Sequence, residues 1–210
     1  LGQHPDVFIC PVKEPAFFAY EGKPDHPSVR QMPSIRTRLA DYEALFAGVS
    51  GETAVGEVSP QYLEHAVPEV IGRIQRYLDS PRLIGIIRHP LDRAYSLFNM
   101  HVRSGVRPGD SDFATIIRRE LACRARGEDP DDPAVELAYS IADRAQLYLE
   151  AFPRDHLAFL LYDDLFADSA AFMRRVFAFL GVDPDHAIDT SFRLNRAGKH
   201  RSRILTALLE

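Results

Sequence analysis

The sequence predicts an α/β domain built around a mostly parallel sheet. Short apolar runs alternate with amphipathic stretches along the 210 residues, the order in which strands and covering helices follow one another in such a domain. One run, LIGII at residues 83–87, is uninterrupted, as expected of a strand covered on both faces. Apolar (46%) and charged (26%) contents are those of a globular domain, and this length can bury a core without disulfides or metal.

Four segments have the length and composition of strands: 6–10, 53–58, 83–87 and 157–162. The last of them, LAFLLY, is expected to be buried like LIGII. Amphipathic helices are expected between and after them: 36–46, 67–78, 91–103, 136–152 and 169–180. Residues 22–33, rich in glycine, proline and charge, predict an exposed loop. Polar segments at 107–112 and 126–133 bracket a shorter helical insertion, and a short helix closes the chain.

Capping residues and helical spacing refine these helices. Ser169 is expected to cap the helix that it begins, and Gly105 and Gly181 to end helices. Side chains at helical spacing are expected to face the core: Leu39, Tyr42, Phe46, Val67, Val70, Ile71, Ile74, Leu78, Ala94, Tyr95, Phe98, Val102, Phe172, Val176 and Phe179.

Charge and cysteine content narrow the function classes. The net charge of −5 gives no global basic field, so we expect no nucleic-acid partner. No apolar run approaches the ~20 residues that cross a bilayer, and no signal peptide is visible. Cys10 and Cys123 lack metal-ligand spacing, which predicts free thiols in the cytoplasm, or alternatively one disulfide in an exported protein. The eight histidines are scattered, and no metal is expected.

The segment IIRHPLDRAYS, residues 86–96, has the pattern of an anion site. A buried strand ends, Arg88 follows at once, and proline opens a helix that carries Ser96. Ligands of open α/β sheets bind beyond the carboxyl ends of strands, where an arginine can fork onto a phosphate. The alternative is a strand-to-helix loop with a surface arginine and a solvated serine.

This segment resembles the 3′-phosphate-binding motif of the sulfotransferase family: a strand, Arg-x-Pro, Arg, then Ser at a fixed distance and Gly. The resemblance covers nearly the whole chain and implies a P-loop-like parallel sheet with helices on both faces, in one domain at 1–210. It also implies that Arg88 and Ser96 hold the 3′-phosphate of 3′-phosphoadenosine 5′-phosphosulfate (PAPS). Arg93 matches a recurrent arginine of the motif.

Residues 1–18 resemble the family's L-x-x-HP-x-h and K-E-x-x-FF patterns, where h is apolar. By that resemblance Glu14 is the general base, which an attacking hydroxyl needs in order to lose its proton. The alternative is a solvated loop carboxylate beside Lys13. Phe17 and Phe18 are expected to form wall and core.

Two further segments resemble parts of the family pattern. GEVSPQYL at 56–63 is similar to its G-E-x-S-P-x-Y-L stretch, where Glu57 either is structural or lies near the acceptor. Some glycan-modifying members have lysine at the position of Val58. Residues 195–203 resemble the basic loop that closes over the nucleotide phosphates. The implied phosphate contacts are Gly198, Lys199 and Arg201, or else this is a solvated basic tail.

The family's phosphosulfate loop, roughly P-K-x-G-T-T, has no counterpart in the chain. We therefore expect the domain to be N-terminally incomplete, with its first strand and this loop within about a dozen residues before Leu1.

The predicted function is in-line transfer of a sulfuryl group from PAPS, without metal, to a hydroxyl or less often an amine of a small-molecule or glycan acceptor. One alternative is a P-loop kinase or NTPase, for which Asp163 and Asp164 are the candidate magnesium ligands. Another is a sulfotransferase-like module that binds a partner without catalysis.

Overall fold

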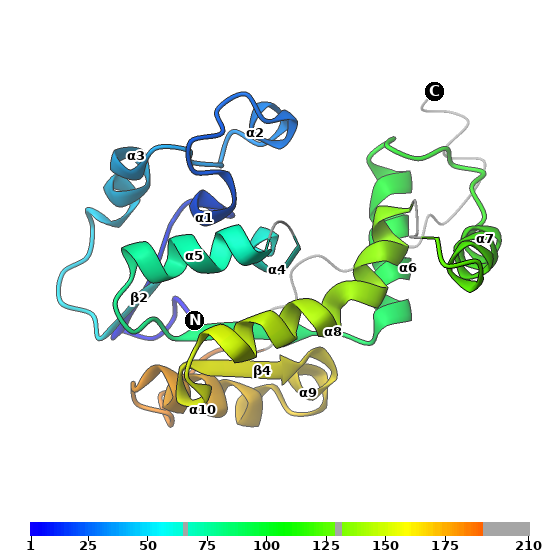
Figure 1. Ribbon diagram of the computed structural model, residues 1–210. Helices are drawn as coiled ribbons and strands as arrows, with labels where there is room; N and C mark the ends of the chain where they lie inside the picture. Colours follow the sequence, from blue (N-terminus) through cyan, green and yellow to red (C-terminus); the bar gives the residue numbers. More distant parts are fainter. Residues whose placement is uncertain (65–66, 129–131, 191–210) are drawn as a thin grey trace, which may run out of the picture.

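The computed structural model describes residues 1–64, 67–128 and 132–190, with strands flanked by helices (Figure 1). Strand β1 (Val7–Ile9) pairs in parallel with β2 (Ala54–Gly56), and β3 (Leu83–Ile87) pairs in parallel with β4 (Leu157–Leu161). All four strands were predicted, and both pairings are parallel as expected. Within the described residues the two pairs are separate, because no strand joins β2 to β3.

Ten α-helices and two 3-10 turns make up the rest of the described secondary structure. The helices before β3 are α1 (Phe17–Tyr20), α2 (Pro27–Gln31), α3 (Leu39–Glu43), α4 (Gln61–Glu64) and α5 (Val67–Tyr77), with η1 (Ala44–Phe46) after α3. Those after β3 are α6 (Pro90–Arg103), α7 (Phe113–Ala125), α8 (Pro133–Ala151), α9 (Tyr162–Ala167) and α10 (Ser169–Leu180), with η2 (Arg154–His156) before β4.

Helices cover the strands from two sides (Figure 1). On one side the larger core cluster joins α1, α5 and α8 to Leu83 of β3 and to Leu157 and Phe159 of β4. On the other side Phe177 of α10 packs with Val7 of β1 and Val182. The expected α/β arrangement, with helices on both faces, is confirmed.

The two long apolar strands are less covered than expected. Ile86 of β3 is 48% exposed and Leu161 of β4 is 58% exposed, whereas both LIGII and LAFLLY were predicted to be buried. The physical reason is the sheet's width. Each pair has only two strands in the described part of the chain, so every strand has an edge without a neighbour.

Several local predictions were wrong by a turn or a residue. Residues 22–33 were expected to be all loop but contain α2, which begins at Pro27 with His26 accepting from the Ser28 amide. The cap of α10 is Asp168, which accepts from the Ala171 amide at 2.9 Å, while the expected cap Ser169 is the first helical residue and donates to the Leu165 carbonyl.

The buried faces of the helices were predicted more accurately than the burial of the strands. Gly105 and Gly181 follow helices with positive φ (71° and 77°), as expected of helix stops. Leu78 and Tyr95 are exposed because α5 ends at Tyr77 and because the Tyr95 ring lies against Phe98 and Phe113 at the surface. Most other expected core positions are at least half-buried.

Both cysteines are free thiols, as predicted, so the alternative of a disulfide is excluded. Among the described helices none combines the length and the apolar content that a bilayer crossing requires.

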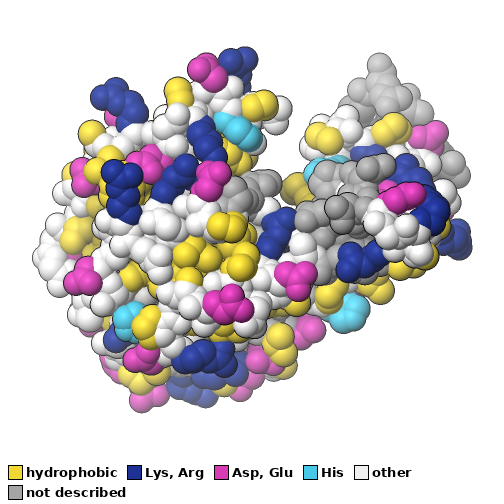
Figure 2. Space-filling view, viewed as in Figure 1, with side chains coloured by type: hydrophobic (Ala, Val, Ile, Leu, Met, Phe, Trp, Pro, Cys, Tyr) yellow, Lys and Arg dark blue, Asp and Glu magenta, His cyan; other side chains and the backbone are white. Residues whose placement is uncertain are grey.

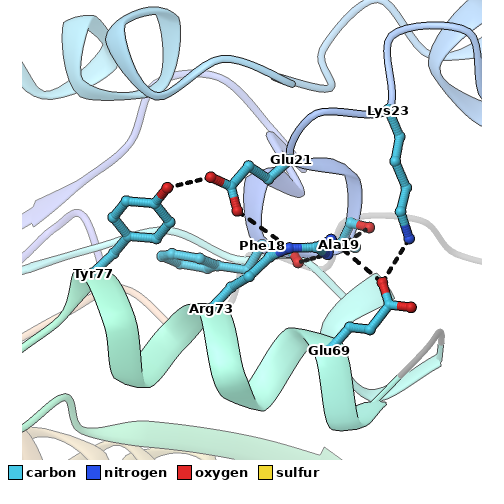
Figure 3. A network of polar contacts seen from close by, with 7 residues as sticks. All are labelled: Phe18, Ala19, Glu21, Lys23, Glu69, Arg73 and Tyr77. Atoms are coloured by element: carbon cyan, nitrogen blue, oxygen red, sulfur yellow. Dashed lines mark hydrogen bonds and ion pairs between the residues drawn. The ribbon is translucent and has the colours of Figure 1, made fainter.

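An arginine network fastens the short helix α1 to α5 (Figure 3). Arg73 of α5 donates through Nη1 to the carbonyl of Phe18 at 2.9 Å and lies with Nε 3.2 Å from the Glu21 carboxylate. Its Nη2 is 3.3 Å from Glu69, which also binds Lys23 at 2.7 Å. The Arg73 side chain is only 18% exposed, so this guanidinium satisfies carbonyls that would otherwise be left without donors at the end of α1.

We predict that Arg73→Ala destabilises the fold by about 2–3 kcal/mol, because it leaves the Phe18 carbonyl and the Glu21 carboxylate without this donor in a poorly solvated place. Arg76→Ala is the matched control on the same helix. The Arg76 guanidinium is exposed and stacks 5.3 Å from the Tyr77 ring, a contact worth about 0.5–1 kcal/mol. Urea unfolding of both variants measures the difference, and equal losses would contradict this role of Arg73.

Candidate active site

The predicted site residues follow the carboxyl ends of the strands. Glu14 and Glu57 come after the paired strands β1 and β2, and Arg88 and Tyr162 come directly after the paired strands β3 and β4. Because each pair is parallel, the two members of each couple lie at the same edge of their sheet. Figure 2 shows the molecular surface hollowed between the part that contains α1, α2 and α3 and the part that contains α6 and α7.

Glu14 is held by a side chain from α4. Gln61 is 6% exposed and donates through Nε2 to Glu14 Oε2 at 3.2 Å. The other carboxylate oxygen lies 3.2 Å from the ammonium of Lys13, whose side chain is 80% exposed. The Glu14 side chain keeps 21% of its surface accessible. The alternative of a freely solvated loop carboxylate therefore does not describe it, although Lys13 is its neighbour as expected.

The hydrogen bond to Glu14 determines the orientation of the Gln61 side-chain amide. Its Oε1 is buried and has no hydrogen-bond partner among the described residues, while Nε2 faces the Glu14 carboxylate. A flipped amide would place Oε1 against a carboxylate oxygen and lose the one hydrogen bond that the side chain makes.

Glu57 lies in a network of hydroxyl groups. Ser59 donates to Glu57 Oε2 at 2.7 Å, and Tyr62 donates to Oε1. Burial raises the pKa of the Glu57 carboxyl above its ordinary value, against the opposing effect of these two hydrogen bonds. Burial, and after it the charge of Glu57, also raises the pKa of Tyr62 well above the usual range of a phenol. Glu57 therefore accepts two hydrogen bonds within the chain, while a place near the acceptor stays a prediction.

The same carboxylate acts on two further buried groups, although burial is the main cause in both. The pKa of Tyr42 and that of Cys10 are raised by burial and also by the negative charge of Glu57. Arg36 opposes the shift at Cys10. Around Glu57 the chain thus keeps phenols and a thiol in their neutral forms.

Arg88 is placed as the sequence predicted, directly after β3. Its guanidinium lies 5.1 Å from the ring centroid of Tyr162, at the end of the neighbouring strand β4. Its Nε is buried and has no hydrogen-bond partner in the described part of the chain. Ser96 lies in the second turn of α6 and is exposed. The structure thus contains an arginine fixed by an aromatic face, with a donor still to be satisfied.

Arg93 has a carboxylate partner, whereas Arg88 lies against an aromatic ring. Its Nη2 forms an ion pair with Glu64 Oε1 at 2.5 Å, and both side chains are about a quarter exposed. This pair joins α6 to α4, so the recurrent arginine of the motif acts here between two helices.

Helix α4 therefore connects the two halves of the site. Its first residue, Gln61, reaches Glu14, and its last, Glu64, reaches Arg93. Helix α8 fixes α4 in turn, since Tyr148 donates to the Tyr62 carbonyl at 2.6 Å and Arg144 donates to the carbonyls of Leu63 and Glu64.

The remaining predicted residues either lie outside the described ranges or have partners elsewhere. Gly198, Lys199 and Arg201, and with them the whole basic segment 195–203, lie outside the described residues. Asp164, a candidate magnesium ligand of the kinase alternative, forms an ion pair with Arg175 at 2.9 Å. In the ranges that the structure describes, no three acidic, histidine or cysteine side chains are grouped as metal ligands.

Sequence reasoning did not identify Gln61, Ser59 and Tyr62 as partners of the two glutamates. All three belong to the GEVSPQYL segment, of which only Glu57 and Val58 were singled out. A usable signal was present, since three hydrogen-bonding side chains cluster directly after a predicted strand.

Comparison with known proteins identifies the family and the fold of the chain. Residues 62–201 match the family model described as the sulfotransferase domain, which is about two thirds of the chain. A sulfotransferase from Alicyclobacillus acidocaldarius is similar in structure, with a TM-score of 0.73 and 28% sequence identity over 99% of this chain and 81% of that one. A sulfotransferase domain from the curacin biosynthetic pathway gives a TM-score of 0.46 and 15% identity over 72% and 48% of the two chains. No curated protein matches the sequence.

The fold, with its parallel strand pairs, and the family match place the chain in the sulfotransferase class. The chain belongs to the sulfotransferase domain family.

Proposed function

We propose that this protein transfers a sulfuryl group from PAPS to a hydroxyl, or less often an amine, with Glu14 as general base. The observation that carries the nucleotide part is the position of Arg88, which directly follows β3, lies against the Tyr162 ring and has a buried Nε that no described residue satisfies. An anionic phosphate is the ligand that a forked guanidinium recognises best. Ser96, exposed on α6, and the basic residues Lys199 and Arg201 with Gly198 complete the proposed set of phosphate contacts.

The proposed reaction is one in-line displacement. The acceptor oxygen forms a bond to sulfur while the bond between sulfur and the phosphate oxygen of PAPS breaks. The acceptor proton passes to the Glu14 carboxylate, and 3′,5′-adenosine bisphosphate leaves. Gln61 and Lys13 each contact a different oxygen of Glu14, so the carboxylate is oriented before the acceptor arrives. No step requires a metal ion.

We propose that the 5′-phosphosulfate is bound by a loop that precedes Leu1, together with a strand. The support is the separation of the two strand pairs, since in the described residues nothing pairs with the free edges of β2 and β3. The nucleotide experiments below accordingly use the full-length protein. An upstream sequence without a lysine-containing, glycine- and threonine-rich segment would reject this proposal.

The acceptor is proposed to be a small molecule or a glycan. Val58, next to Glu57, is 60% exposed, and it stands where some glycan-modifying members have lysine. This departure weakens the transfer of those members' glycan specificity to this chain. Two free thiols suit a reducing compartment, and we propose the cytoplasm.

We predict that Arg88→Ala raises the dissociation constant of 3′,5′-adenosine bisphosphate at least tenfold, because a charge-assisted hydrogen bond worth ~1.5–3 kcal/mol is lost. Arg103→Ala is the control, as Arg103 is exposed at the end of α6 and changes the net charge equally. Calorimetric titration of wild type and both variants measures the effect. 5′-AMP should bind wild type and Arg88→Ala almost alike, and equal losses in the two arginine variants would reject the assignment.

We predict that Glu14→Gln lowers turnover by about 10²–10⁴-fold at saturating PAPS, because the amide keeps the shape of the side chain but takes no proton. Affinity for the bisphosphate should stay within about twofold. Glu43→Gln, at an exposed position of α3, is the matched control. Sulfuryl transfer to a panel of hydroxyl and amine compounds gives the rates. Near-normal turnover in Glu14→Gln would remove Glu14 from the mechanism, and bisphosphate binding without any transfer in wild type would favour the non-catalytic module.

A further inference from the structure

The backbone that presents Glu14 is in an unusual conformation. Glu14 has φ of 56° and Ala16 has φ of 45°, both in the left-handed region that residues with a Cβ seldom occupy. Pro15 lies between them and is fully buried. A turn of this kind persists only where the surrounding structure holds it, and such turns are concentrated at functional sites. We call residues 14–16 the base turn.

Two contacts from outside hold the backbone of the base turn. The amide of Ala16 donates to Ser59 Oγ at 3.0 Å, and the carbonyl of Pro15 accepts from the amide of Arg36 at 2.8 Å. The first contact satisfies the amide of the N-cap residue of α1, the donor that a side chain at the third helical position accepts in a capping box.

Ser59 is able to accept from Ala16 because of where its own proton points. A hydroxyl has one proton and two lone pairs. The proton of Ser59 is donated to Glu57 Oε2 at 2.7 Å, so a lone pair is directed at the Ala16 amide at 3.0 Å. Tyr62 donates to the other oxygen of Glu57. We call the two hydrogen bonds that link Glu57 through Ser59 to the Ala16 amide the relay; no proton is transferred along it.

We propose that Glu57 is a positioning residue that holds the base turn through Ser59 and thereby orients Glu14 toward the acceptor. This inference rests on the proposed function of Glu14. Glu57 is assigned no proton transfer in it, and its two oxygens accept hydrogen bonds from hydroxyls of this chain. The relay also separates two supports of the base: Ser59 sets its backbone, and Gln61 sets its carboxylate.

The first test follows hydrogen exchange at the Ala16 amide by NMR. Glu57→Gln offers only one acceptor oxygen to two donating hydroxyls, so the Ser59 proton loses its fixed direction. We expect exchange at Ala16 to rise at least tenfold in Glu57→Gln, although residue 57 does not touch Ala16, and to rise at least as much in Ser59→Ala. Unchanged exchange at Ala16 in a folded Glu57→Gln variant overturns the relay.

A second pair of variants applies if Glu57→Gln does not fold. Tyr62→Phe removes one donor but leaves the hydrogen bonds from Ser59 to Glu57 and from Ala16 to Ser59. Ala16 exchange should therefore stay within about threefold of wild type in Tyr62→Phe and rise in Ser59→Ala. Equal exchange in these two variants also overturns the relay.

The second test is a double-mutant cycle on turnover. Ser59→Ala should lower kcat by about 10–100-fold, as a displaced catalytic group does, with bisphosphate affinity within about twofold. Ser59→Thr keeps the hydroxyl and should restore most of the rate. Because Ser59 acts through Glu14, adding Ser59→Ala to Glu14→Gln should cost less than about threefold more.

These measurements distinguish a failure of the positioning role of Glu57 and Ser59 from a failure of Glu14 as the general base. Losses that multiply in the double variant would overturn positioning through Glu14, even if Ser59→Ala alone is slow. A normal rate in Glu14→Gln would reject Glu14 as base, and the Ala16 exchange measurement would still report whether the relay exists.

Discussion

The pair of hydrogen bonds that the Glu57 carboxylate accepts from Ser59 and Tyr62 determines how the candidate site is arranged. Both donors belong to the segment that leaves β2 and enters α4, so one half-buried carboxylate fixes the path of the chain at that point. A poorly solvated carboxylate without donors would be costly, and the raised pKa of Glu57 reflects burial that the hydroxyls only partly offset. The position of the base turn, through the Ala16 amide, depends on this arrangement.

Helix α4 links the proposed acceptor region around Glu14 to the proposed nucleotide region beside Arg93. It is only four residues long, yet it is fixed by Tyr148 and Arg144 of α8, reaches Glu14 through its first residue and is paired with Arg93 through its last. A short helix has little stability of its own, so its position is set by these tertiary contacts. The proposed nucleotide and acceptor regions are consequently joined by side-chain contacts as well as by the sheet.

The order of the strands and long helices, and the residues that follow the strands, could be predicted from the sequence. Arg88 was placed correctly because a strand of five apolar residues ends just before it, and the order of strands and long helices followed from apolar spacing. The short helices α1 and α4 were missed, because their stability comes from packing and from distant donors such as Arg73 and Arg144. Gln61 reaches Glu14 across 47 positions, a distance that no local pattern encodes. The expected cap Ser169 was one residue late, since two adjacent residues could both cap and only geometry selects Asp168.

The most direct test of the account is a crystal structure of the full-length protein with 3′,5′-adenosine bisphosphate bound. The account predicts that the Arg88 guanidinium, still against the Tyr162 ring, binds the 3′-phosphate through Nε and a terminal nitrogen, with the Ser96 hydroxyl on the same phosphate. It also predicts that Glu14 remains hydrogen-bonded to Gln61 and faces the 5′-phosphate side of the nucleotide. A bisphosphate bound elsewhere, or a 3′-phosphate that does not contact Arg88, would contradict the account.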